Sequence, residues 1–212
     1  MDAALRAGVA LFTAGEYHAA HDPWEAVWLD LESGTDDERL LHGLIQYTAA
    51  LHHASGRNWS GATGLAGSAR AYLADLPPDY RGVNVGDVRP YLAGLAADPE
   101  RVERGPPVPL TLDGRALALA ELGDDPDAAA LAAEAIVEEY DRYDEDVVER
   151  AIGFARDEVA AEERGETVST RFVALVADFV GDAPRRDLIY RRLADHVERR
   201  VQRERDVDGL FE

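Results

Sequence analysis

The residues best suited to chemistry gather in residues 19–28, which read Ala-Ala-His-Asp-Pro-Trp-Glu-Ala-Val-Trp. If this stretch and the residues just before it are helical, one face within an arc of roughly 100° carries Tyr17, His18, His21, Glu25 and Trp28. Imidazole and carboxylate groups can hold zinc, iron or manganese, or can work together as a general acid–base pair near neutral pH. His21 and Glu25 are therefore the candidate catalytic residues.

A second polar stripe lies on the helix expected over residues 36–55, whose start carries the capping signal of Thr35 with Glu38. An arc of about 60° opposite the apolar face of this helix holds His42, Gln46, Ala49 and His53. If the two helices pack side by side, the two stripes face each other. We expect a binding site or a buried network built from His18, His21, Glu25, Trp28, Gln46, His53 and Asn58.

Two functions fit these stripes, and the residues alone leave both open. In the first, a hydrogen-bonded network of His, Glu, Gln and Asn fixes how the helices pack, and the protein is a binding or interaction module for an unidentified small molecule or protein. In the second, His21 and Glu25 form a metal-dependent or acid–base hydrolase-like site. The residues do not identify a particular metal or cofactor. The sequence also lacks the Glu-x-x-His repeat of a di-metal bundle, and it contains no nucleophile motif.

The elements that must position these residues are helices. Apolar spacing, glycines and prolines predict helices over residues 2–14, 16–31, 36–55, 59–76, 85–97, 128–140, 145–163, 171–180 and 184–205. Pro23 falls inside the second of them and should kink it, and Asn58 is placed to cap the fourth. Asp113-Gly114 predicts a small β-hairpin near residues 110–118.

The expected fold class is therefore all-α, a multi-helix bundle with that small hairpin. The chain of 212 residues exceeds the usual domain size of about 100–150 residues. We expect a core domain over residues 1–124, which carries the polar stripes, and a C-terminal helical extension over residues 125–212.

Composition excludes several classes of protein. Cysteine is absent, so disulfides, thiolate nucleophiles and Cys-bound zinc are excluded. No run of 18 apolar residues occurs and the N-terminus lacks a secretory signal, so we expect a cytoplasmic chain without a membrane partner. The sequence leaves homo-oligomer formation open.

The charge is strongly acidic, with 42 acidic against 22 basic residues, a net charge of −20, and no lysine among the basic ones. Acid excess and lysine depletion resemble those of halophilic proteins, in which molar salt shortens the Debye length to about 3 Å and screens the repulsion. This charge disfavours nucleic-acid binding. The exception is residues 185–205, with eight arginines against four acidic residues, which leave docking of nucleic acid or an acidic partner as a third function.

One family shares the order of these residues. The pattern consists of Gly15-Glu16-Tyr17, Ala20-His21, Glu25, Trp28, Gly43-Leu44-Ile45-Gln46, Ala50, His53, Asn58, Gly61-Ala62 and Leu65. It resembles the small helical proteins grouped as domain of unknown function 309, over about residues 5–76. The resemblance implies an all-helical fold with His21, Glu25, Trp28, Gln46 and Asn58 as signature positions. It implies no activity, and it does not reach residues beyond about 125.

Overall fold

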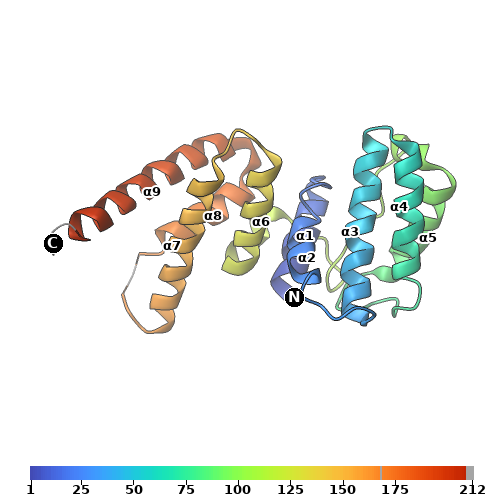
Figure 1. Ribbon diagram of the computed structural model, residues 1–212, viewed down its shortest axis with the longest axis horizontal. Helices are drawn as coiled ribbons and strands as arrows, with labels where there is room; N and C mark the ends of the chain where they lie inside the picture. The colour runs from blue at the N-terminus through green and yellow to red at the C-terminus, as the bar shows by residue number, and fades with distance from the viewer. Residues whose placement is uncertain (168, 209–212) are drawn as a thin grey trace. The chain divides into compact units, whose positions relative to one another are not determined.

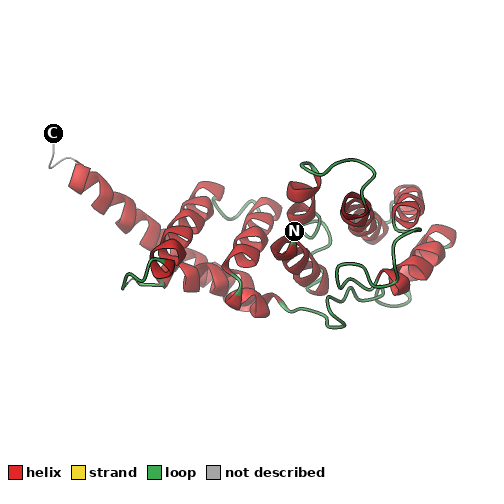
Figure 2. Ribbon diagram, turned by 90° about the horizontal axis from the view of Figure 1, so that it is seen from below, coloured by secondary structure: helices red, strands yellow, loops and turns green. Residues whose placement is uncertain are grey.

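A computed structural model describes residues 1–167 and 169–208 and is helical almost throughout (Figure 1). Figure 2, coloured by secondary structure, shows helices joined by loops. Within these described residues no strand forms, which confirms the all-α prediction. The chain divides into two compact units, Met1–Leu119 and Ala120–Glu212. Among the residues described, no helix combines the length and the apolar character that crossing a membrane requires.

The N-terminal unit is a row of helices in which each packs against the next along the chain (Figure 1). Its helices are α1 (Asp2–Thr13), α2 (Asp22–Trp28), α3 (Asp36–Ser55), α4 (Trp59–Tyr72), α5 (Val85–Ala97) and the 3-10 helix η1 (Pro99–Glu103). Leucines on one face of α1 and α3 form the core with Trp24 and Tyr47, both of which are fully buried. Burial of such large side chains contributes about 1.5–3 kcal/mol each, which holds the helices together.

The helix α2 corrects the sequence prediction, because it begins at Asp22 and not at residue 16. A proline in a helix interior loses one hydrogen bond and collides with the carbonyl four residues earlier, whereas in the first turn its missing N–H costs nothing. Pro23 therefore marks the start of the helix, and the carbonyl of His21 accepts the first bonds, from the N–H groups of Trp24 and Glu25 at 3.0 and 2.9 Å. Residues 17–20 form turns, so His18 does not share a helix face with Glu25.

The start of α3 was predicted correctly, and so was the cap of α4. Thr35 accepts a hydrogen bond from the Glu38 N–H, and Asn58 accepts one from the Gly61 N–H. In a capping box the side chain at the position of Glu38 reaches back to the N–H of the capping residue. Here the Glu38 carboxylate bonds instead to the Gly34 N–H at 3.2 Å, one residue earlier.

Two tight turns replace the β-hairpin predicted near residues 110–118. Leu112 and Arg115 exchange backbone hydrogen bonds around Asp113-Gly114, whose φ angles of 52° and 75° identify a type I′ turn. The segment from Tyr80 to Val83 forms a similar turn around Arg81 and Gly82, and Val83 bridges to Leu112. The prediction was right about the turn but not about a ribbon, because the pairing stops at isolated bridges.

The turn at Arg81 is fastened to the start of α3. Arg81 adopts a φ of 53°, a conformation that glycine or asparagine adopts more easily. Its guanidinium donates to Asp37 through Nε at 2.8 Å and through a terminal nitrogen at 2.5 Å, and the Tyr80 hydroxyl donates to the same carboxylate at 2.9 Å. These contacts hold the loop between α4 and α5 against α3.

The C-terminal unit is a second helical bundle. Its elements are the 3-10 helix η2 (Leu119–Asp124), α6 (Pro126–Glu139), α7 (Glu145–Glu163), α8 (Arg171–Gly181), the 3-10 helix η3 (Ala183–Arg185) and α9 (Arg186–Asp208). Two buried charged side chains form hydrogen bonds with backbone groups at the two ends of α8. The Glu158 carboxylate accepts from the N–H of Phe172 at 2.8 Å, and Arg186 donates to the carbonyl of Phe179 at 3.0 Å. Both contacts supply partners for backbone groups that a helix leaves unpaired at its ends.

Candidate functional site

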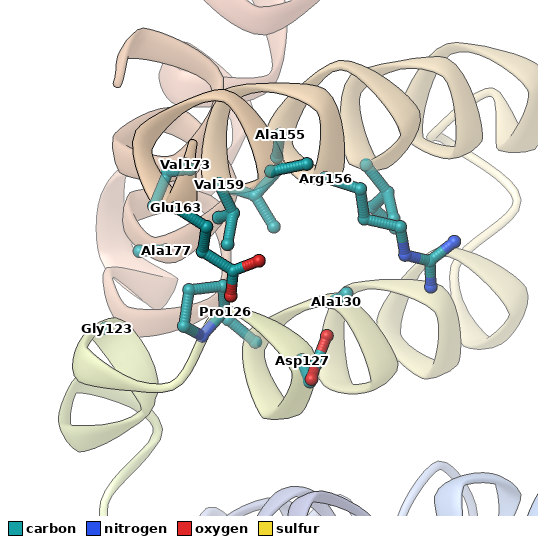
Figure 3. Close-up of a pocket in the computed structure, with 14 residues that line it drawn as sticks. Gly123, Pro126, Asp127, Ala130, Ala155, Arg156, Val159, Glu163, Val173 and Ala177 are labelled. Carbon is teal, nitrogen blue, oxygen red and sulfur yellow. The ribbon is translucent and has the colours of Figure 1, made fainter. Parts of the chain in front are cut away.

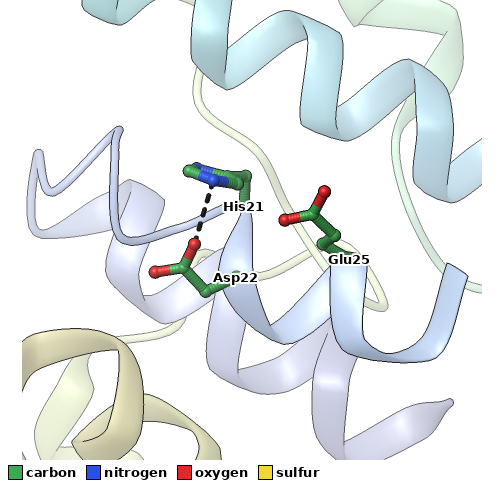
Figure 4. Close-up of side chains that lie close together, drawn as sticks. All are labelled: His21, Asp22 and Glu25. Carbon is green, nitrogen blue, oxygen red and sulfur yellow. Dashed lines mark ion pairs between the residues drawn. The ribbon is translucent and has the colours of Figure 1, made fainter. Parts of the chain in front are cut away.

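Three groups suited to metal binding or proton transfer meet at the start of α2. Figure 4 shows His21, Asp22 and Glu25 close together, with the His21 ring and the Glu25 carboxylate on the same side of the helix. One ligand atom from each residue lies within 4.8 Å of those from the other two. His21 and Glu25 are four residues apart, about one helical turn, and Asp22 directly follows His21, so the three side chains leave the chain at neighbouring positions. We name His21, Asp22 and Glu25 the α2 cluster.

The closest contact in the α2 cluster joins His21 to Asp22. The His21 Nε2 and the Asp22 Oδ1 lie 2.9 Å apart, and both side chains are partly accessible, at 22% and 23% exposure. The hydrogen bond to Asp22 raises the pKa of His21 above its usual value, against the opposing effect of burial, and the charge of Glu25 adds to the increase. His21 therefore holds a proton to higher pH than a free imidazole does.

Trp24 fixes the α2 cluster to the fold. Its side chain is fully buried, and a Cβ at Gly8 of α1 would lie only 2.2 Å from the indole Cε2. Only glycine at position 8 lets the two helices approach this closely. Because Pro23 and Trp24 face inward, the α2 cluster is left on the partly accessible side of the helix.

Further imidazoles extend from the α2 cluster to the end of α3. The His18 ring lies 5.0 Å from the His21 ring and 4.8 Å from the His52 ring, and the rings of His52 and His53 lie 6.1 Å apart. At the far end the Asn58 amide donates to His53 Nδ1 at 2.8 Å. The structure thus brings both His18 and Glu25 near His21, whereas His53 and Asn58 lie with the cap of α4.

Trp28 lies in a separate polar group at the other end of α2. Its Nε1 donates to the Glu38 carboxylate at 3.0 Å, and His42 Nδ1 contacts the same carboxylate at 3.2 Å. The His42 ring packs between Trp28, at 4.6 Å, and Tyr72 of α4, at 3.8 Å. Glu38 is only 8% exposed, and the bond from Trp28 lowers its pKa despite burial. This network joins α2, α3 and α4.

The contacts of six predicted site residues form three groups: His18 with His21 and Glu25, His53 with Asn58, and Trp28 with Glu38. Gln46 is half-buried and makes no side-chain hydrogen bond to any of the described residues. Sequence reasoning placed His42 in the second polar stripe, but it missed Asp22, Glu38 and His52 as members of a site. Asp22 had a usable signal, because Pro23 favours a helix start at Asp22 and so places Asp22 beside His21.

The comparisons with known proteins concern this part of the chain. Residues 5–65 match the model of a domain of unknown function, DUF309. This part of the chain is therefore similar to that family. The DUF309 segment contains the α2 cluster, His52 and Asn58.

One curated relative is also similar to this chain. An uncharacterized protein of Aquifex aeolicus (strain VF5) is 30% identical over 81 residues, which cover 38% of this chain and 24% of that protein. The matched part thus spans about a quarter of the relative's length. The descriptions of the DUF309 family and of this relative name no activity.

The Arg-rich helix α9 uses part of its positive charge locally. Arg200 Nε lies 2.6 Å from Glu204 Oε1, and Arg185, just before α9, donates through Nε to Asp182 at 2.7 Å. Arg186 is buried against the end of α8. Pairing of this kind is the usual role of a basic helix face, and it weakens the argument for docking of nucleic acid or an acidic partner.

Proposed function

We propose that the N-terminal unit binds one divalent transition-metal ion through the α2 cluster. The observation that supports this is the approach of three ligand atoms, from His21, Asp22 and Glu25, to within 4.8 Å of one another. Atoms bonded to one ion at about 2.1 Å lie about 3–3.5 Å apart, so a small rotation of the side chains completes the set. One nitrogen and two oxygen ligands suit zinc, manganese or iron.

Three protein ligands leave at least one coordination position open. Catalytic zinc sites have this arrangement, with water or substrate in the open position, whereas structural sites are closed by four protein ligands. The partial exposure of His21 and Asp22 gives water access to the α2 cluster. An ion bound there would make a water molecule more acidic, which is the chemistry of a metal-dependent hydrolase.

Protons compete with the metal at His21. The ion must replace the proton that the imidazole shares with Asp22, because a histidine ligand binds in its neutral form. The pKa of His21 is raised by that hydrogen bond, so the competition extends to higher pH than for an ordinary histidine. We expect metal affinity to fall as the pH decreases through the raised pKa of His21.

The test is metal binding by the untagged chain, since a histidine tag would bind metal itself. Protein purified without chelator in about 2 M KCl is analysed for metal content and is titrated with Zn²⁺ and Mn²⁺ by calorimetry. We expect one ion per chain, and at least a tenfold loss of affinity in His21→Ala, which removes a ligand, and in Glu25→Gln, which replaces a charged carboxylate ligand by a neutral amide. The control is His196→Gln, which removes the histidine of the C-terminal unit and should bind as the wild type does.

Two results would contradict the proposal. One is the absence of stoichiometric binding by the wild-type chain. The other is unchanged affinity in His21→Ala, which would place the bound ion elsewhere. Circular dichroism spectra of the variants at the same salt concentration establish that they are folded.

A further inference from the structure

A cavity in the C-terminal unit is a second candidate site, separate from the α2 cluster. It has a volume of about 400 Å³ and lies between α6, α7 and α8 (Figure 3). This volume is within the range of about 300–1,000 Å³ that is usual for pockets holding small organic molecules. The residues that line the cavity all belong to the C-terminal unit, so its shape does not depend on the placement of the N-terminal unit.

The walls of the cavity are apolar, and the side chains that form them are largely buried. Ile152 of α7 and Val176 of α8 line it with exposures of 1% and 3%. The facing positions of α6 and α7 carry alanines, including Ala130 and Ala155, whose short side chains leave the space between the helices unfilled. Unfilled apolar space lacks favourable dispersion contacts, and an apolar guest would supply them.

The rim of the cavity is negatively charged. Asp127 of α6 and Glu163 of α7 line the cavity and are both exposed, so their carboxylates lie at its rim, and Figure 3 shows them on facing helices. Neither carboxylate forms an ion pair with another of the described residues. Arg156 also lines the cavity, but its guanidinium lies 3.6 Å from Glu134 of α6, which balances its charge.

The helix terminus at the rim does not favour an anion. The start of α6 would carry a partial positive charge, but the Asp125 carboxylate accepts a bond from the Ala128 N–H at 3.0 Å, and Asp127 follows in the first turn. Glu163 is the last residue of α7, where the helix itself carries partial negative charge. The field at the opening therefore attracts a cation.

We propose that this cavity binds a small amphiphilic cation, such as an alkylammonium ion. The apolar part occupies the space between the alanines of α6 and α7, and the ammonium group lies at the rim between Asp127 and Glu163. An ammonium ion has three donors and no acceptor, which suits two carboxylates that have no cationic partner in the part of the chain that the structure describes.

The test compares ligands of equal length and different charge. Octylammonium, octanoate and 1-octanol are titrated into the full chain by calorimetry in about 0.5 M KCl, where the Debye length is still about 4 Å. We expect octylammonium to bind at least tenfold more tightly than octanoate, with 1-octanol between them. Butylammonium separates the cavity from general attraction to an acidic surface, and it should bind at least tenfold more weakly than octylammonium.

Variants locate the binding. The double variant Asp127→Asn with Glu163→Gln should reduce octylammonium affinity at least tenfold and leave 1-octanol unchanged. Its matched control is Asp157→Asn with Glu162→Gln, which removes the same charge from the same unit outside the cavity and should bind as the wild type does. Ala130→Leu fills the cavity and should abolish binding of both eight-carbon ligands.

The proposal is overturned if octylammonium and octanoate bind equally, if butylammonium binds as tightly as octylammonium, or if the two double variants behave alike. If Ala130→Leu does not fold, the proposal can still be refuted, because the charge variants change residues on the exposed rim and test the proposal separately. All measurements are repeated in the presence of a chelator. Binding that persists there is independent of the proposed metal site, and binding that disappears would also overturn the proposal.

Discussion

Replacing Glu38 by alanine should strongly destabilise the N-terminal unit, because three hydrogen bonds converge on its carboxylate. The residue is 8% exposed, and its carboxylate accepts bonds from Trp28 Nε1, the Gly34 N–H and His42 Nδ1 at 3.0, 3.2 and 3.2 Å. A hydrogen bond to a charged group contributes about 1.5–3 kcal/mol, and water replaces part of it where the donor is half-exposed. We expect a loss of about 3 kcal/mol, or a decrease in Tm of about 10 °C for a unit of this size.

Tryptophan fluorescence measures this loss directly. The three tryptophans, Trp24, Trp28 and Trp59, all belong to the N-terminal unit, so thermal melting followed by their emission reports on that unit alone. Glu38→Gln retains one acceptor oxygen and should lose about half as much stability. Glu32→Ala is the matched control, because this exposed glutamate in the preceding loop should change the Tm by less than about 2 °C.

The effect of pH provides a second check on Glu38. Its pKa is lowered in the folded protein, chiefly by the bond from Trp28, so its stabilising effect is complete above the ordinary glutamate pKa of about 4.3. That effect is lost as the pH falls through the lower, folded-state pKa. The Tm difference between wild type and Glu38→Ala should therefore persist at neutral pH and close in acid. Equal Tm values at neutral pH would refute the reasoning.

Two further predictions concern packing and charge. Gly8→Ala should lower the free energy of unfolding, measured in urea, by about 3 kcal/mol, because its Cβ would lie 2.2 Å from the buried Trp24 ring. Gly64→Ala, on the open face of α4, should instead raise it by about 0.5–1 kcal/mol. Equal effects of the two substitutions would contradict the packing described. Raising KCl from about 0.1 to 2 M should raise the Tm by screening the net charge of −20, as the halophilic interpretation requires. A Tm that is unchanged by KCl would remove the support for that interpretation.

Much of the fold could be predicted from the sequence because its signals are local. The apolar spacing of residues 2–13, the cap at Thr35 and the cap at Asn58 each act within one or two turns, and each appears in the structure. The start of α2 was missed because a helical pattern was continued through Pro23. Moving that start to Asp22 separates His18 from the helix and places Asp22 beside His21.

The candidate site was harder to predict because its grouping depends on tertiary packing. The 100° pattern put Trp28 on the face of His21, but the loop between α2 and α3 brings its indole to Glu38. His52 and His53 are adjacent in the sequence, and only the packing of the 17–21 turn against α3 brings the His52 ring, at 4.8 Å, to His18. No spacing rule within one helix contains this information.

The contact between Arg81 and Asp37 has a consequence for how this protein can vary. Arginine is a poor choice for a left-handed turn position, and it is kept there by a carboxylate 44 positions away in the chain. Relatives that lack an acid at position 37 have no such reason to retain arginine at position 81, and we expect asparagine or glycine there. The two positions should therefore covary, although neither one lies near the α2 cluster in the sequence.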